Sequence, residues 1–87
     1  IGAICIAPTL LAKVLGSEGV NITLGDDPAI AKEIAKTGAH HVNCAVTDYI
    51  SDRDHKVLTT PAYMHEAKPH EVVAGIRKMI RELVEMA

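Results

Sequence analysis

Cys5 is the residue whose position points most directly to chemistry. It lies near the end of an apolar run at residues 1–6 that is typical of a buried strand, and Pro8 suits the first position of a following helix. A cysteine at a strand-to-helix turn is held clear of the sheet and near helix N–H groups, which favour the reactive thiolate. The alternative is a small buried hydrophobic residue, because free cysteine is often buried.

A second group of candidate residues follows the strand-like run at residues 56–59. Thr60, Pro61 and Tyr63 come directly after this run. Ligands in open α/β sheets bind at the carboxyl ends of the strands. If the strand at residues 1–5 lies beside this run, Cys5, Thr60, Pro61 and Tyr63 are expected to share one crevice. From the residues alone, a plain hydroxyl-rich loop is the alternative.

The histidines do not form a metal-binding pattern. His40 and His41 are adjacent, and adjacent residues of a strand point to opposite faces, so only one of them can join Cys44. His65 and His70 imitate a zinc-protease signature, but they are five residues apart and Pro69 interrupts the helical turn between them. We therefore predict no metal and no cofactor. His65 is interpreted as a surface residue or as a neighbour of Cys5.

The composition excludes several classes of partner. The 87 residues include nine basic and eleven acidic side chains, a net charge of −2, and only two aromatic residues. Without a basic stripe or stacking platforms, nucleic-acid binding is disfavoured. No apolar run approaches the length of a membrane span and no signal peptide is visible, so no membrane partner is predicted. Two cysteines in unrelated contexts are read as reduced thiols of a cytoplasmic protein.

The order of elements is typical of an α/β fold. Residues 20–24 alternate like a half-buried strand, Asp27 and Pro28 suit the start of a helix that ends by residue 37, and residues 41–44 form a short strand. Two further runs, at 49–51 and 56–59, are expected to form a hairpin. With no repeat and no linker, the chain is one domain or part of one.

The last predicted helix, residues 69–85, is amphipathic. Its apolar positions form one stripe at helical spacing: Val72, Val73, Ile76, Met79, Ile80, Leu83 and Val84. Gly75 lies within the stripe, and a glycine inside a helix usually permits close packing on a neighbour.

Three features together resemble a known family. The run Cys5-Ile6-Ala7-Pro8, the motif Thr59-Thr60-Pro61-Ala62-Tyr63-Met64 and the closing amphipathic helix are similar to the ElbB ("enhancing lycopene biosynthesis") family of the class I glutamine amidotransferase-like, or ThiJ/PfpI, superfamily. The resemblance implies the C-terminal half of a flavodoxin-like doubly wound sheet with a β-hairpin insertion. Residues 1–87 would then be the C-terminal part of one amidotransferase-like domain.

The same resemblance implies roles for individual residues. Cys5 is expected to be the nucleophile and the Ile6 N–H part of an oxyanion hole, with Ala7, Thr60, Pro61 and Tyr63 lining the pocket. Many relatives carry a histidine after the strand that matches residues 20–24, whereas this chain has Gly25-Asp26-Asp27. A Cys–His pair at that position is therefore absent, which argues against efficient amidotransferase or protease chemistry.

For the whole protein, the resemblance implies weak glyoxalase-type activity that converts glyoxal or a related dicarbonyl, a small carbonyl substrate, to a hydroxy acid. The alternative is a non-catalytic or redox-sensing domain associated with isoprenoid metabolism. The chain has no initiator Met and opens inside an apolar strand, so we expect a missing N-terminal half that supplies an acidic partner for Cys5. A homodimer is also expected, and a self-standing mini-domain that dimerises is the alternative to a fragment.

Overall fold

The centre of the molecule is a pair of parallel strands, β1 (Gly2–Ile4) and β5 (Val57–Thr60), in a computed structural model that describes all 87 residues. Their register places Ala3 opposite Thr59 and Ile4 opposite Thr60. Strand β4 (Ile50–Asp52) pairs antiparallel with the other edge of β5, which gives the order β1-β5-β4. The predicted hairpin is thereby confirmed.

Two short strands, β2 (Asn21–Ile22) and β3 (His40–His41), form a separate parallel pair. The sequence predicted longer strands at 20–24 and 41–44. The Asn21 N–H donates to Asp52 Oδ2 at 2.7 Å, and the Thr23 N–H donates to Thr59 Oγ1 at 3.0 Å. Side chains of β4 and β5 thus accept hydrogen bonds that backbone carbonyls accept in a continuous sheet, which separates β2 from the β1-β5-β4 sheet. On the β3 side, pairing ends where the Leu24 N–H donates to the His41 ring at 3.0 Å.

Helices α1 (Pro8–Leu15) and α2 (Pro28–Ala35) pack on β2 and β3. Both helices begin at proline, and the Asp27 carboxylate caps α2 by accepting from the Ala29 N–H at 2.9 Å. Their apolar sides form the main core with the following buried residues: Ala12, Val20, Ile22, Leu24, Ile34, Ala39 and Val57.

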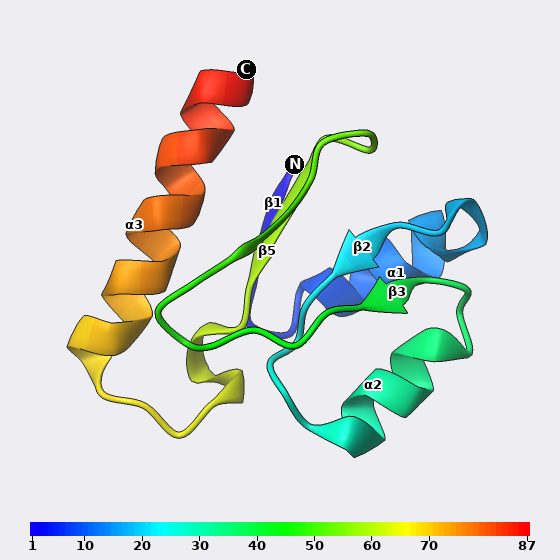
Figure 1. Cartoon of the computed structure of the whole chain (residues 1–87), viewed down its shortest axis with the longest axis horizontal. Helices are drawn as coiled ribbons and strands as arrows, with labels where there is room; N and C mark the ends of the chain where they lie inside the picture. Colours follow the sequence, from blue (N-terminus) through cyan, green and yellow to red (C-terminus); the bar gives the residue numbers. More distant parts are fainter.

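Helix α3 (Pro69–Met86) covers the opposite face of the β1–β5 pair (Figure 1). It contains the predicted close approach at Gly75, where an added Cβ would lie 2.3 Å from the Val46 carbonyl oxygen. Two short 3₁₀ helices, η1 (Gly16–Glu18) and η2 (Ala62–Met64), follow α1 and β5.

The apolar stripe of α3 is only partly covered, which differs from the prediction that it packs as a whole. Val72 and Met79 are buried, whereas Val73, Ile80 and Val84 are exposed. Val73, Ile80 and Val84 are at positions i, i+7 and i+11, so they share one side of the stripe, and α3 buries only the other side. None of the helices combines the length and apolar character needed to cross a bilayer.

Candidate active site

Cys5 lies at the turn between β1 and α1, as the sequence predicted. Its φ is +63°, a left-handed conformation that is uncommon for any residue other than glycine. The Cys5 N–H donates to the Thr60 carbonyl oxygen at 3.0 Å, so β5 holds the strained residue in place. Cys5 remains partly exposed. A strained, accessible residue between a strand and a helix has the geometry of a nucleophile elbow.

The backbone around the elbow leaves one amide free. The Ala7 N–H donates to the Ile4 carbonyl at 3.2 Å, the Thr9 N–H donates to the Ile6 carbonyl at 3.0 Å, and Pro8 has no N–H. The Ile6 N–H donates no hydrogen bond within the chain. An unpaired amide directly after a nucleophile is a suitable donor for a developing oxyanion.

A second strained residue lies at the end of β5. Ala62 has a φ of +47° and is buried at the start of η2. Strained backbone of this kind concentrates at functional sites. Because β1 and β5 are parallel neighbours, Cys5 and Ala62 both lie beyond the carboxyl ends of these strands, on the same side of the sheet.

The other predicted pocket residues differ in exposure. Thr60 is fully buried, and its hydroxyl donates to the Asp48 carbonyl at 2.7 Å. Pro61 is buried beside it, whereas Tyr63 is 58% exposed. None of the cavities of the molecule is lined by Ala7, Thr60, Pro61 or Tyr63. Thr60 supports the elbow through its carbonyl, and the pocket-lining roles stay predictions.

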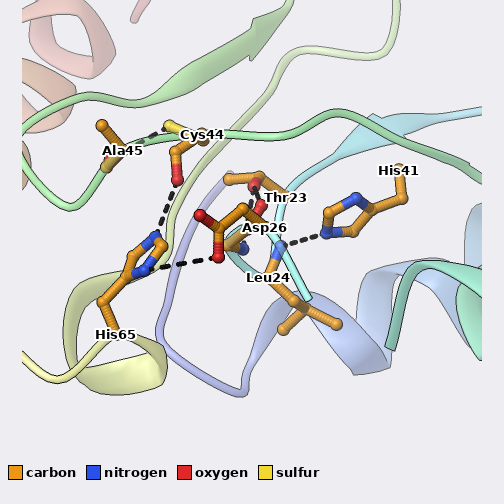
Figure 2. Close-up of polar contacts among 8 residues, drawn as sticks. Thr23, Leu24, Asp26, His41, Cys44, Ala45 and His65 are labelled. Atoms are coloured by element: carbon orange, nitrogen blue, oxygen red, sulfur yellow. Dashed lines mark hydrogen bonds and ion pairs between the residues drawn. The ribbon is translucent and has the colours of Figure 1, made fainter. Parts of the chain in front are cut away.

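His65 connects η2 to the turn after β2 (Figure 2). Its Nε2–H donates to the Cys44 carbonyl oxygen at 2.8 Å, and its Nδ1 lies 3.7 Å from Asp26 Oδ1. The side chain is 19% exposed, and its ring packs on the backbone of Gly25. Thus His65 is not a free surface residue. Its Nε2–H ties the end of η2 to the segment after β3, whereas its Nδ1 lies beyond hydrogen-bond distance of Asp26.

His65 also reveals what the sequence alone did not show. The turn at Gly25 lacks a histidine of its own, but His65, directly after η2, reaches it through space. The only signal in the sequence was that His65 directly follows the motif at residues 59–64.

His41 and Cys44 lie near this turn, and each side chain makes one hydrogen bond. His41 Nε2 accepts from the Leu24 N–H at 3.0 Å, and burial lowers the pKa of His41, which favours the neutral ring (Figure 2). Burial and the nearby Asp48 carboxylate raise the pKa of Cys44 to about 11, so its thiol stays protonated at neutral pH. No group of three or more His, Cys, Asp or Glu side chains converges in the structure.

Known proteins share both this sequence and this fold. The chain is 36% identical to the rat ES1 protein homolog, mitochondrial, and 38% identical to the human glutamine amidotransferase-like class 1 domain-containing protein 3, mitochondrial. It superimposes with a TM-score of 0.90 and 31% identity on the crystal structure of an isoprenoid biosynthesis protein with amidotransferase-like domain from Ehrlichia chaffeensis. No protein-family model matches the chain.

The chain is a homologue of class I glutamine amidotransferase-like domain proteins. The recognition and the α/β fold class predicted from the sequence are thus confirmed. This amidotransferase-like chain is covered to 99% in each comparison, but it spans only 35% of the length of the two curated relatives and 40% of the solved structure. Both curated relatives are mitochondrial by name, a compartment other than the cytoplasm predicted here, and the location of this chain stays a prediction.

Proposed function

We propose that the protein carrying this chain is a glyoxalase-type enzyme in which Cys5 attacks the aldehyde of glyoxal or a related dicarbonyl. The observation that supports this proposal is the strained elbow at Cys5, with a φ of +63° and an unpaired Ile6 N–H directly after it. The elbow presents a thiol, and the free amide offers a hydrogen bond to the oxygen on which negative charge develops.

The proposed reaction needs only water as co-reactant. The Cys5 sulfur bonds to the aldehyde carbon, and the carbonyl oxygen takes up a proton to form a hemithioacetal. A base removes the hydrogen on that carbon and the proton returns to the neighbouring carbon, which gives a hydroxyacyl thioester. Water then releases the hydroxy acid and restores the thiol. The dicarbonyl is oxidised at one carbon and reduced at the other, so no external oxidant takes part.

The base for this reaction is proposed to come from the part of the domain outside these 87 residues. His65 is hydrogen-bonded to the Cys44 carbonyl and not to Cys5, and Cys44 is buried. Strand β1 lies at the edge of its sheet in this chain although its sequence is as apolar as that of a central strand. This unpaired edge supports an N-terminal half, with an acidic partner for Cys5, packing against β1. A homodimer is part of the same proposal.

The test compares Cys5→Ser with Cys44→Ser in the full-length protein. Cys5→Ser is expected to reduce glyoxal turnover to the uncatalysed rate, whereas Cys44→Ser leaves most of it because the Cys44 thiol is buried and protonated. Iodoacetamide followed by peptide mass spectrometry is expected to label Cys5 before Cys44. Unchanged turnover in Cys5→Ser would refute the proposal. Rapid labelling and peroxide oxidation of Cys5 without any turnover would favour the redox-sensing alternative.

A further inference from the structure

An apolar groove lies between α1 and α2, and Ile6, the residue after Cys5, forms its border at the elbow. It encloses about 310 Å³, which is at the small end of the range for ligand pockets. Its apolar wall is formed by Ile6, Leu24, Ala29, Ile30, Ile34 and Met64. The Ile6 side chain is 62% exposed, so this wall is open to solvent at the end nearest Cys5.

The position of the groove connects it to the candidate active site. Ile6 follows Cys5 in the elbow, Leu24 precedes the turn after β2, and Met64 ends η2 after β5. Two of these wall residues therefore follow the carboxyl ends of β1 and β5, which are parallel neighbours, and the third follows the carboxyl end of β2 in the other sheet. This is the edge at which open α/β sheets bind ligands.

The chemistry of the wall selects an uncharged occupant. Glu33 is the single charged side chain that borders the groove, and its carboxylate is paired with Lys36 Nζ at 3.0 Å in solvent. Thr9 is the other polar residue at the border. A ligand in the groove thus meets methyl and methylene groups and no charged group that is free to bind it.

We infer that this groove holds the alkyl part of the substrate. The inference rests on the proposed function and narrows it: the preferred substrate is a 2-oxoaldehyde with a short unbranched alkyl group, whose aldehyde reacts at Cys5. Glyoxal, which has no alkyl group, leaves the groove empty. Each methylene that leaves water on binding is expected to raise the rate with limiting substrate about fourfold, until the groove is full.

The test uses the reactivity of Cys5 and needs no turnover. The full-length protein is treated with N-methyl-, N-ethyl-, N-butyl- and N-hexylmaleimide, and the labelling rate of Cys5 is measured by peptide mass spectrometry. The labelling rate with each maleimide is divided by the rate of the same maleimide with free cysteine, which removes differences in reactivity among the reagents. The variant Ala29→Met fills the groove from its wall. The matched control is Ala35→Met, the same change at an exposed position of α2 outside the groove.

The expected result is a rate that rises with chain length in the unmodified protein and in Ala35→Met, but stays flat in Ala29→Met. A flat series in all three proteins, with Cys5 reactive and glyoxal turned over, overturns the inference and leaves the proposed function standing. A rising series without turnover of any 2-oxoaldehyde refutes the proposed function and retains the groove as an alkyl-binding site. A Cys5 that reacts with no maleimide refutes both.

Turnover supplies the second measurement. The ratio of kcat/KM for a butyl-substituted 2-oxoaldehyde to that for glyoxal is expected to exceed 10 in the unmodified protein and to fall towards 1 in Ala29→Met, by the same estimate of about fourfold per methylene. If another segment or a second copy fills the groove instead, the maleimide series is flat and Ala29→Met changes the oligomeric state in sedimentation. That outcome overturns the inference in favour of an interface.

Discussion

At the scale of single residues, backbone strain marks the edge of the sheet where chemistry is proposed. Three residues other than glycine have positive φ: Cys5, Lys56 and Ala62. Lys56 is explained by the tight turn between β4 and β5. Cys5 and Ala62 lie beyond the ends of paired strands, where each strained conformation costs about 1–3 kcal/mol and persists only because its surroundings impose it. The hydrogen bond from the Cys5 N–H to the Thr60 carbonyl oxygen is one of the contacts that hold Cys5 in this conformation.

Asp52 is the most heavily bonded carboxylate of the chain. It is buried, and it accepts hydrogen bonds from the Asn21 N–H at 2.7 Å, the His55 N–H at 3.1 Å and the His55 ring at 2.9 Å. Burial alone raises the pKa of Asp52, but these three hydrogen bonds outweigh it and hold the pKa below its usual value. The same hydrogen bond raises the pKa of the His55 ring, because the Asp52 carboxylate favours its protonated form.

We predict that Asp52→Ala destabilises the fold by about 1–3 kcal/mol at pH 6, because it removes the acceptor that joins β4 to β2. The size of this destabilisation depends on pH. The Asp52 contribution is complete above about pH 4, the unfolded value, and is lost as pH falls through its lower folded pKa. The His55 contribution is present below about pH 6.5 and is lost as pH rises through its higher folded pKa.

Urea denaturation of the unmodified protein and Asp52→Ala between pH 3 and pH 9 measures this difference. It is expected to be largest near pH 5–6 and smaller at both ends. Asp54→Ala, an exposed carboxylate of the same turn, is the control and is expected to change stability little. If the difference in unfolding free energy between the unmodified protein and Asp52→Ala does not vary with pH, the proposed interaction between Asp52 and His55 is contradicted.

At the scale of elements, the approach of α3 to the sheet depends on Gly75. The backbone of α3 passes so close to the loop before β4 that an added Cβ would lie 2.3 Å from the Val46 oxygen and 3.0 Å from Thr60 Oγ1. Thr60 also carries the carbonyl that holds Cys5. The packing of α3 is thereby linked to the elbow through a single residue of β5.

We predict that Gly75→Ala destabilises the protein by about 1–3 kcal/mol, since α3 must move away from Val46 and Thr60. On an exposed helix the same change stabilises by roughly 1 kcal/mol, so the sign of the effect is diagnostic. Thermal denaturation gives the measurement, and Arg77→Ala on the exposed side of α3 is the control. A gain in stability for Gly75→Ala would show that the close approach does not exist in solution.

At the scale of the whole molecule, the chain is flat and incompletely covered. Its Cα atoms extend 34 × 31 × 15 Å, and 22 of the 87 residues are buried. Leu10 and Val14 lie one helical turn apart on α1, and each is more than 60% exposed. Exposed apolar side chains gathered in this way are typical of surfaces that contact another protein segment.

We predict that the isolated 87-residue chain self-associates at micromolar concentration. Sedimentation velocity is expected to show oligomers, and the double variant Leu10→Lys with Val14→Lys is expected to raise the monomer fraction because it places charge on the α1 stripe. Lys13→Gln on the same helix is the control, since Lys13 is exposed and polar. A cooperative, well-folded monomer of the unmodified chain would contradict this prediction.

The sequence alone determined those features that depend on neighbouring residues. The apolar run before Pro8 placed Cys5 at a strand-to-helix turn, the Asp27 and Pro28 pair located the start of α2, and the alternating runs around residues 52–55 predicted the hairpin. Capping, the restricted φ of proline and hydrophobic periodicity act over a few residues, so they can be read along the chain. The family was recognisable for the same reason, because its motifs are contiguous.

Only the tertiary structure decided which distant segments meet. It divided the strands into two sheets, placed the ring of His65 on Gly25, buried Thr60 under α3 and left Val73, Ile80 and Val84 exposed. The groove bordered by Ile6 likewise arises from residues of α1, α2, η2 and the segment after β2 that no sequence spacing connects. Such contacts depend on shape and on competition among buried hydrogen-bond partners across the whole molecule, which local patterns do not encode.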